Sequence, residues 1–289
     1  MKPEPTRPLV LEFTKMTGAG NDFVVLDNRF YHFNADELSS LAKRLCTRRV
    51  GVGADGLLAL EESPNESLHF RMVYFNADGS RGSMCGNGAR CLGRFARITG
   101  MEDNPLRFET DAGEYAVDVP QDRGASVRLH LPPYENYNPS CLPTRAVASG
   151  PERVDYIWTG TDHIVVSVDD VASYPVSEVG PVLRNDTGIA PNGSNVNFVQ
   201  TMASEGTESL HLRVRTFERG VEAETMACGT GAVASAIVTL LKTNHSGSSV
   251  IVEMNGGTLH VSYVGELEDP SEIILEGPAD LVYRGTIEI

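Results

Sequence analysis

The sequence predicts an α+β fold built from two similar domains that face each other. The chain of 289 residues is long for a single hydrophobic core and comfortable for two. It also contains an internal repeat, because MCGNGA at residues 84–89 recurs half a chain later as ACGTGA at residues 227–232. A predicted strand precedes each copy and a predicted helix follows it. The sequence therefore predicts pseudo-symmetric halves, each with a cysteine at the start of a helix.

The first half is predicted to begin with two strands, at residues 10–13 and 23–26, around a Gly-rich turn at residues 18–21. Apolar residues then recur at helical spacing over residues 34–48, where Asn34 or Asp36 suits the N-cap. A strand at residues 70–75 leads to the first motif. The helix after the motif covers residues 89–98, and three more strands follow at residues 106–108, 114–119 and 127–131.

The second half repeats this order after a proline-rich stretch at residues 132–139, which we expect to be the linker. Its strands are predicted at residues 156–158, 164–168, 195–200, 212–217 and 250–254, with a helix at residues 232–241. Two last strands, at residues 273–275 and 281–289, are expected to return to the first domain. We therefore assign residues 1–132 to an N-terminal domain and 133–276 to a C-terminal domain, with residues 277–289 returning to the first.

Charge and composition exclude several classes of protein. The chain has 24 Lys and Arg against 39 Asp and Glu, and its formal net charge of −15 disfavours nucleic acid and anionic membranes as partners. No run of about 18 apolar residues is present to span a bilayer. The start, MKPEP, lacks the apolar core of a signal peptide. Five cysteines without a CxxC pair argue against a disulfide scaffold or a structural zinc site, so we expect a cytoplasmic protein.

Two of the five cysteines differ from the others in their context. A lone cysteine is most often a small buried apolar residue, and Cys46, Cys91 and Cys141 fit that role. Cys85 and Cys228 each open a predicted helix and are followed by Gly-x-Gly. Free backbone N–H groups and the helix dipole at this position are expected to lower the pKa of a thiol and to bind a carboxylate.

Two such thiols that face each other have three possible roles. They form a structural disulfide, or they form a redox pair, although the CxxC spacing typical of redox pairs is absent. Alternatively, one thiolate removes a proton from one face of a stereocentre while the opposite thiol delivers a proton to the other face. Because the α-proton of an amino acid is weakly acidic, this last role needs donors aimed at the substrate carboxylate.

We expect neither a cofactor nor a metal. Residues 51–56 match GxGxxG, but they follow a predicted helix rather than a strand, so we reject a dinucleotide site. The seven histidines are scattered and offer no metal-ligand cluster.

Several polar residues near the two motifs are candidate ligand contacts. The loop asparagines are more often turn residues when each is considered alone: Asn21, Asn76, Asn87 and Asn195. Glu218 and Arg219 follow the strand before the second motif, where they would supply charge to a zwitterionic ligand. His163 closes a polar turn, and near a thiol it would bias the thiol pKa, although a purely structural role is the commoner one.

Four motifs, taken in order, resemble the diaminopimelate epimerase family. They are KMTGAGNDF at residues 15–23, FNADGS at 75–80, CGNGARC at 85–91, and ERG with ACGTGA at 218–220 and 227–232. The resemblance runs from about residue 13 to the C-terminus. It implies two pseudo-symmetric α/β domains, each a mostly antiparallel sheet wrapped around a central helix, with the active site in the cleft between them.

The resemblance also implies an activity. The family comprises isomerases that convert LL-2,6-diaminopimelate to the meso form without a cofactor such as PLP, for lysine and peptidoglycan precursor biosynthesis. A homodimer is implied as well.

Roles for individual residues follow from the same resemblance. Cys85 and Cys228 would be the catalytic acid/base pair. The helix N-termini would hold the carboxylate at the reacting centre through Gly86, Asn87, Gly229 and Thr230. The remaining substrate contacts would come from Asn21, Asn76, Thr161, Asn195, Glu218 and Arg219. His163 and Glu218 would influence the ionisation of the thiols.

The chain departs from the family pattern at three places. Thr161 stands where many members have Asn, Gly56 where some have Gln, and the loop at residues 221–224 is one residue longer than in some members. These changes bear on substrate selectivity rather than on the type of reaction. The alternatives that stay open are a two-thiol racemase of proline or hydroxyproline, a redox protein, and a binding module with inert thiols. The sequence does not decide which cysteine acts on which stereoisomer.

Overall fold

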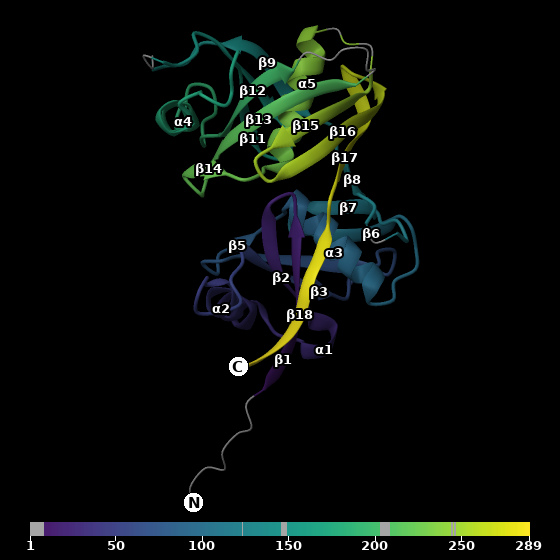
Figure 1. The fold of residues 1–289 in the computed structure, drawn as a ribbon. Helices are drawn as coiled ribbons and strands as arrows, with labels where there is room; N and C mark the ends of the chain where they lie inside the picture. Colours follow the sequence, from purple (N-terminus) through teal and green to yellow (C-terminus); the bar gives the residue numbers. More distant parts are fainter. Residues whose placement is uncertain (1–8, 123, 146–148, 203–208, 244, 246) are drawn as a thin grey trace, which may run out of the picture.

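The computed structural model describes residues 9–122, 124–145, 149–202, 209–243, 245 and 247–289, which form two lobes, one above the other in Figure 1. The residues in which we looked for a signal peptide lie outside this part of the chain. The first half contains β1 (Val10–Gly18), β2 (Asn21–Asp27), α1 (Asn28–Tyr31), α2 (Ala35–Cys46), β3 (Gly56–Glu61), β4 (Phe70–Asn76), β5 (Arg81–Gly82), α3 (Gly86–Ile98), β6 (Leu106–Thr110), β7 (Gly113–Asp118) and β8 (Val127–Leu131).

The second half contains a corresponding set of elements. They are β9 (Glu135–Cys141), β10 (Val154–Trp158), β11 (Asp162–Ser167), α4 (Val176–Arg184), β12 (Asn195–Met202), β13 (Leu210–Glu218), β14 (Ala223–Thr225), α5 (Gly229–Thr243), β15 (Ser249–Met254), β16 (Gly257–Glu266), β17 (Asp269–Gly277) and β18 (Asp280–Glu288). Each predicted strand and helix corresponds to one of these elements, usually with longer bounds in the structure.

Strand pairing has the same pattern in both halves. In the first half the order is β18–β1–β2–β3–β4–β6–β7–β8. In the second half it is β9–β10–β11–β12–β13–β15–β16–β17. The parallel pairs occupy the same places in both, β2–β3 with β4–β6 and β11–β12 with β13–β15, and the other neighbours are antiparallel. The predicted pseudo-symmetry of the mostly antiparallel halves is therefore confirmed.

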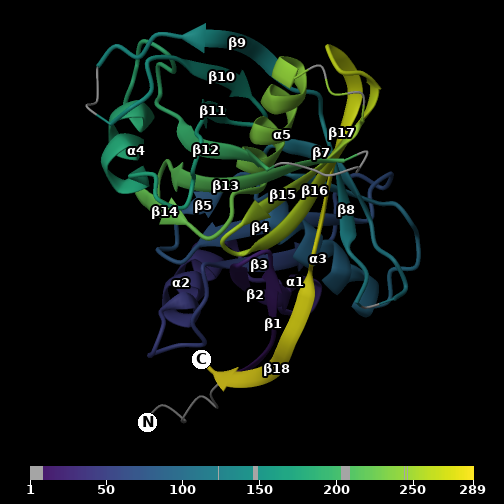
Figure 2. The ribbon, with the colours of Figure 1, turned by 45° about the horizontal axis from the view of Figure 1, so that its top comes forward.

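The outer strand of each half directly follows, in the chain, the last strand of the other half's series. β9 follows β8 in the chain but pairs with β10, and β18 follows β17 but pairs with β1. β18, yellow in Figures 1 and 2, leaves the upper lobe and runs along the lower lobe. β8 also pairs with β17, which links the two halves into one hydrogen-bonded series. The domain boundaries at residues 132/133 and 276/277 stay a prediction.

The helices α3 and α5 are the centres of the two lobes. α3 packs among Phe70, Phe108 and the other apolar side chains of one core, and α5 is enclosed by the strands of the second lobe. Most residues of both helices are buried, glycines and alanines included. The outer faces are covered by α2 and α4, which lie over separate apolar clusters. Each sheet thus wraps around a central helix whose first turn is directed at the other lobe.

The helix α2 forms where the sequence predicts it, and its start explains why. Asn34 accepts hydrogen bonds from the N–H groups of Asp36 and Glu37, while the Glu37 carboxylate accepts from the Asn34 N–H. This capping box satisfies donors that the first helical turn leaves free. α2 ends at Cys46 and β3 begins at Gly56, so the GxGxxG segment follows a helix, as predicted, and leads into a strand.

Two expectations from the sequence need correction. The proline-rich stretch is not a linker over its full length, because residues 135–141 form β9 and pair with β10. Only residues 132–134 lack regular structure, so the crossing between the halves is short. Between β4 or β13 and the following cysteine, where only a strand before each motif was predicted, the structure adds short strands, β5 and β14, which fold back on β4 and β13. Within the described part of the chain, no helix combines the length and hydropathy needed to cross a membrane.

Candidate active site

A cleft of ≈ 520 Å³ lies where the first turns of α3 and α5 meet, and residues from both halves line it. The candidate residues from the sequence that line it are Asn21, Asn76, Cys85, Gly86, Asn87, Thr161, Asn195, Glu218, Arg219, Cys228, Gly229 and Thr230. His163 does not line the cleft, because it is fully buried behind Thr230. The fold thus brings together residues that are far apart in the sequence.

The two helix N-termini approach each other closely at the floor of this cleft. Cys85 is the N-cap residue of α3 with extended backbone (φ −144°, ψ 117°), and Cys228 immediately precedes α5. A Cβ added to Gly229 would lie 3.9 Å from the Gly86 Cα and 3.6 Å from the Asn87 Oδ1. The absence of side chains at these glycines leaves the free N–H groups of both first turns open to one ligand, and both helix dipoles favour an anion there.

Burial has a larger effect on the two thiols than the helix termini have. The pKa of the Cys85 thiol is raised by burial, although the N–H groups of Gly88 and Asn87 act to lower it. Burial and the nearby Glu218 carboxylate raise the pKa of the Cys228 thiol to about 12. The expectation that helix N-termini lower these pKa values is therefore wrong in its net direction, because desolvation of a thiolate outweighs the local hydrogen bonds. All five cysteines are free thiols.

Cys228 is connected to a buried histidine through a threonine hydroxyl. The Cys228 Sγ lies 3.5 Å from the Thr230 Oγ1, and the His163 Nε2 lies 3.0 Å from the same oxygen. Burial, with the Arg219 charge, lowers the pKa of His163 to about 3, so its imidazole is neutral at physiological pH. His163 thus reaches the thiol only through Thr230.

The tautomer of His163 follows from the hydrogen bonds of Asn197. The Thr216 hydroxyl donates to the Asn197 Oδ1 at 3.0 Å, so the Asn197 Nδ2 faces the His163 Nδ1 at 3.0 Å. His163 Nδ1 is then the acceptor, and the ring proton is on Nε2, from which it is donated to Thr230. The Thr230 hydroxyl is left to donate to Cys228, an arrangement that stabilises the thiolate form.

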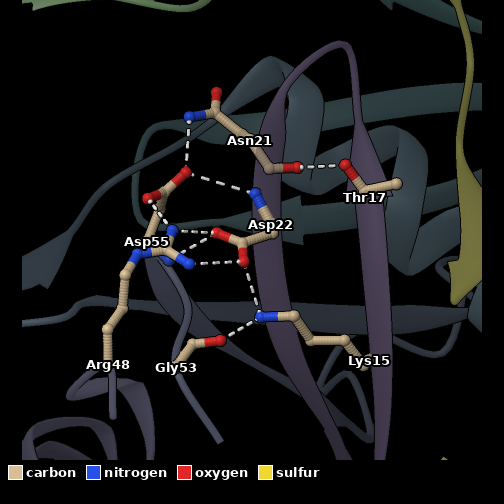
Figure 3. Close-up of polar contacts among 7 residues, drawn as sticks. All are labelled: Lys15, Thr17, Asn21, Asp22, Arg48, Gly53 and Asp55. Atoms are coloured by element: carbon tan, nitrogen blue, oxygen red, sulfur yellow. Dashed lines mark hydrogen bonds and ion pairs between the residues drawn. The ribbon is translucent and has the colours of Figure 1, made fainter. Parts of the chain in front are cut away.

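On the other side of the cleft an ion-pair network holds Asn21. The Asn21 Nδ2 donates to the Asp55 Oδ2 at 3.1 Å, and Asp55 also accepts from the Asp22 N–H and from Arg48. Arg48 bridges Asp55 and Asp22, and Lys15 pairs with Asp22 at 2.7 Å (Figure 3). Figure 3 also shows the Asn21 Oδ1 directed away from this network. That oxygen accepts from the Asn87 Nδ2 at 2.6 Å, which fixes the Asn21 amide at both ends.

Arg219 has its position fixed by residues from two loops and a strand. Its guanidinium lies 3.1 Å from the Asp162 carboxylate, donates to the Gly193 carbonyl at 2.7 Å, and donates to the Thr161 Oγ1 at 2.7 Å. The Arg219 N–H donates to the Asn195 Oδ1 at 2.8 Å. The hydroxyl of Thr161, where many family members have Asn, therefore helps to hold Arg219.

Glu218 contributes negative charge at the same place. The residue is half-buried, and burial with the nearby Asp55 raises the pKa of its carboxyl group. Its charge in turn raises the pKa of both Cys85 and Cys228.

Several residues of the site were missed by reasoning from the sequence. Tyr74 lines the cleft and donates to the Asn76 Oδ1 at 2.7 Å, and Tyr115 and Leu131 add apolar wall. Asn197 is fully buried behind His163. These residues lie in predicted strands. The alternation of side chains along a strand indicates which face of the sheet Tyr74 belongs to, but not whether that face borders the cleft. Asn197, which stands between Val196 and Phe198, was the one residue whose sequence context could have indicated a buried hydrogen-bond network.

Comparisons with known protein families agree with the motifs. A family model described as diaminopimelate epimerase matches residues 13–132 and 156–282. A diaminopimelate epimerase from Chlorobaculum tepidum is 40% identical over 275 residues, which is 95% of this chain and 100% of the relative. One from Aquifex aeolicus is 38% identical over 285 residues, 96% of this chain and 98% of the relative.

Solved structures with the same fold are more distant in sequence. A phenazine biosynthesis protein of the PhzF family from Bacillus anthracis has a TM-score of 0.72 at 17% identity, covering 97% of this chain and 100% of the other. A probable proline racemase from Agrobacterium radiobacter has a TM-score of 0.70 at 15% identity, covering 96% and 93%. At these identities the likeness shows the fold alone.

Proposed function

This chain belongs to the diaminopimelate epimerase family and is an isomerase that interconverts LL- and meso-2,6-diaminopimelate, and we propose that Cys85 and Cys228 are its two bases. The observation that carries this assignment is the meeting of two cysteine-led helix N-termini at one cleft. A two-base epimerisation requires one proton-transfer group on each face of the α-carbon. The pseudo-symmetric pair supplies such groups.

In the proposed reaction one cysteine acts as thiolate and the other as thiol. The thiolate takes the α-proton, and the electron pair of the broken C–H bond stays on the α-carbon and its carboxylate. The opposite thiol then gives its proton to the other face, so the configuration inverts and the charge has moved from one sulfur to the other. N–H groups of Gly86, Asn87, Gly229 and Thr230 stabilise the negative charge on the carboxylate during this step.

Ionisation of the first thiol is coupled to substrate binding in this proposal. Burial and Glu218 raise the pKa of both thiols, so the thiol form predominates until a cation enters the cleft. The α-ammonium group of the substrate is such a cation, and it favours a thiolate beside it while it offsets the Glu218 charge. Arg219 and Asn195 are then suited to the distal amino-acid group.

The remaining expectations concern the cofactor, the cellular location and the oligomeric state. We propose that the enzyme works without PLP or another cofactor, because the thiols and donors account for each proton and charge. A cytoplasmic role in lysine and peptidoglycan precursor synthesis agrees with five free thiols. A homodimer is supported by β18, an outer strand that exposes Leu281, Val282 and Tyr283.

The experiment is α-proton exchange under reductant. LL-diaminopimelate is incubated in deuterated water, and deuterium at the α-carbon is followed together with the meso isomer. Wild type is expected to do both, and Cys85→Ala and Cys228→Ala to lose epimerisation by roughly 10²–10⁴-fold, the usual worth of a general acid or base. Cys141→Ala is the matched control, a free cysteine outside the cleft, and should keep full activity.

Three outcomes would contradict the proposal. A folded, reduced wild type that exchanges no α-proton would remove diaminopimelate as substrate, and turnover of proline or hydroxyproline instead would favour the related racemases. Full epimerisation by either cysteine variant would remove the two-thiol mechanism. A requirement for oxidant rather than reductant would indicate a redox protein.

A further inference from the structure

Arg90 is a fully buried arginine in the second turn of α3, and it does not line the cleft. Its Nη2 donates to the Asn87 Oδ1 at 2.7 Å, and its Nη1 lies 3.5 Å from the Gly86 carbonyl oxygen. Its Nε has no hydrogen-bond partner among the described residues. Within that part of the chain Arg90 also forms no ion pair, although buried cations normally have a carboxylate partner.

The guanidinium keeps its charge at this position. Burial lowers the pKa of Arg90 to about 10, which still leaves it cationic at neutral pH. The titratable groups that favour its charged form are the thiols of Cys91 and Cys85, and burial raises the pKa of the Cys91 thiol to about 12, so that thiol is neutral. An uncompensated positive charge therefore lies directly behind Gly86 and Asn87, which form one wall of the cleft.

Arg90 also begins a chain of hydrogen bonds that reaches across the lobe. Because the Asn87 Oδ1 accepts from Arg90, the Asn87 Nδ2 faces Asn21, whose Oδ1 accepts from it at 2.6 Å. The Asn21 Nδ2 donates in turn to Asp55. Two amides that line the cleft thus have their orientation set by a cation at one end and a carboxylate at the other.

The second lobe has no cation in the corresponding place. Thr230 has the position in the second motif that Asn87 has in the first, and the group behind it is the neutral His163. The positive charge of Arg90 is therefore specific to the side of the cleft that carries Cys85.

We propose that Arg90 is a positioning residue for the epimerase, whose guanidinium fixes the Asn87 and Asn21 amides and supplies the positive charge that the substrate carboxylate meets at the α3 terminus. This inference rests on the proposed function. A buried cation without an acidic partner is costly, and a carboxylate at the helix N-terminus provides the missing anion. Arg90 acts through Asn87 and through its field, without touching the substrate.

The test compares Arg90→Met, which removes the charge, with Arg90→Lys, which keeps it. Arg97→Met is the control, because Arg97 lies on the same helix but binds the Glu102 and Asp103 carbonyls away from the cleft. Arg90→Met is expected to raise the KM for diaminopimelate roughly 10- to 100-fold, the loss typical of a charge-assisted contact, with a smaller fall in kcat. Arg90→Lys should recover part of the KM, and Arg97→Met should leave both constants unchanged.

A second readout separates the charge from a packing role. The rate of alkylation of Cys85 by iodoacetamide is measured against pH by peptide mass spectrometry. Cys85 interacts with Arg90 and Cys91 on α3, with Glu218 on β13, with Tyr74 on β4 and with Cys228. Only the first changes in Arg90→Met, so the Cys85 profile should move to higher pH while that of Cys228 stays in place.

Each of these measurements can refute the proposed role of Arg90. An unchanged KM in folded Arg90→Met, or an unmoved Cys85 profile, would overturn it. If Arg90→Met does not fold, the same comparison is made between Arg90→Lys and Arg90→Gln, which keeps a donor for Asn87 but no charge. Wild type that fails to exchange α-protons would refute the proposed function, whereas active wild type with unchanged Arg90 variants would refute this inference alone.

Discussion

His163 makes the stability of this protein depend on acid in a way that can be measured. Its imidazole is fully buried and accepts from Asn197 on one nitrogen while it donates to Thr230 from the other. Protonation would place a cation in this site and would turn the Asn197 contact into a clash of two donors. Burial accordingly lowers the pKa of His163 to about 3 from the ordinary 6.5.

The sign and the size of the pH effect on the free energy of unfolding follow from this pKa shift. The folded pKa lies below the unfolded one, so between about pH 3 and 6.5 the unfolded chain binds the proton that the folded protein excludes. The contribution of His163 is complete above pH 6.5 and is lost as the pH falls toward 3. One pKa unit is worth about 1.36 kcal/mol, so at pH 4 the loss is about 3 kcal/mol, a large part of the stability of a typical domain.

The assay is urea unfolding between pH 7.5 and 4, followed by the fluorescence of Trp158, the single tryptophan. His163→Gln keeps a donor for Thr230 and removes the titration, and His260→Gln is the control at an exposed histidine. Wild type and His260→Gln should lose about 3 kcal/mol more than His163→Gln over this range, since only His163→Gln lacks the buried histidine. Parallel curves for wild type and His163→Gln would refute the reasoning.

Three further outcomes are expected. Gly231→Ala should lower stability by about 1–3 kcal/mol and reduce kcat, because the new Cβ would overlap the Asn197 Oδ1 and displace the His163 contact; wild-type melting and rates would contradict this. Val282→Glu should convert the proposed dimer to a monomer in light scattering, because Val282 is 55% exposed on an outer strand; an unchanged dimer mass would place the interface elsewhere. The kcat/KM for diaminopimelate should rise from about pH 6 to 9, because burial raises the pKa of both thiols; a flat profile would contradict the thiolate requirement.

Local patterns in the sequence were sufficient to predict most of the fold. The strand–loop–cysteine–helix repeat predicted two similar halves, and the capping residue Asn34 marked the start of α2 to within a residue. The linker at residues 132–139 was misplaced because prolines suggest a break, whereas Pro139 lies in the outer strand β9, where one edge needs no hydrogen bonds. Residues 281–289, which the sequence suggested would return to the first domain, form β18 and pair with β1, whereas the pairing of β9 with β10 was missed because the residues of β9 were assigned to the linker.

For the site, the residues that line the cleft were easier to predict than the pKa values of its thiols. The polar residues beside the two motifs were recognisable because they sit in turns that follow or precede strands, and the fold brings them to one cleft. The direction of the thiol pKa shifts could not be predicted from the sequence, because it depends on how deeply the helix N-termini are buried in the folded protein. Arg90 and Asn197 were missed because their importance lies in their complete burial, which depends on the packing of the whole lobe.

The likeness of the halves and the difference in their charges meet separate chemical demands. Two-base chemistry needs proton-transfer groups on opposite faces of one carbon, and in the proposed site the repeat supplies them on two copies of the same local backbone. A cleft with identical halves, however, would accept the substrate equally well in two opposed orientations. β4 ends at Asn76 and β13 ends at Glu218, so a carboxylate takes the place of an amide between corresponding strands. Together with cationic Arg90 behind one helix and neutral His163 behind the other, this inequality gives a zwitterion one preferred orientation in the proposed site.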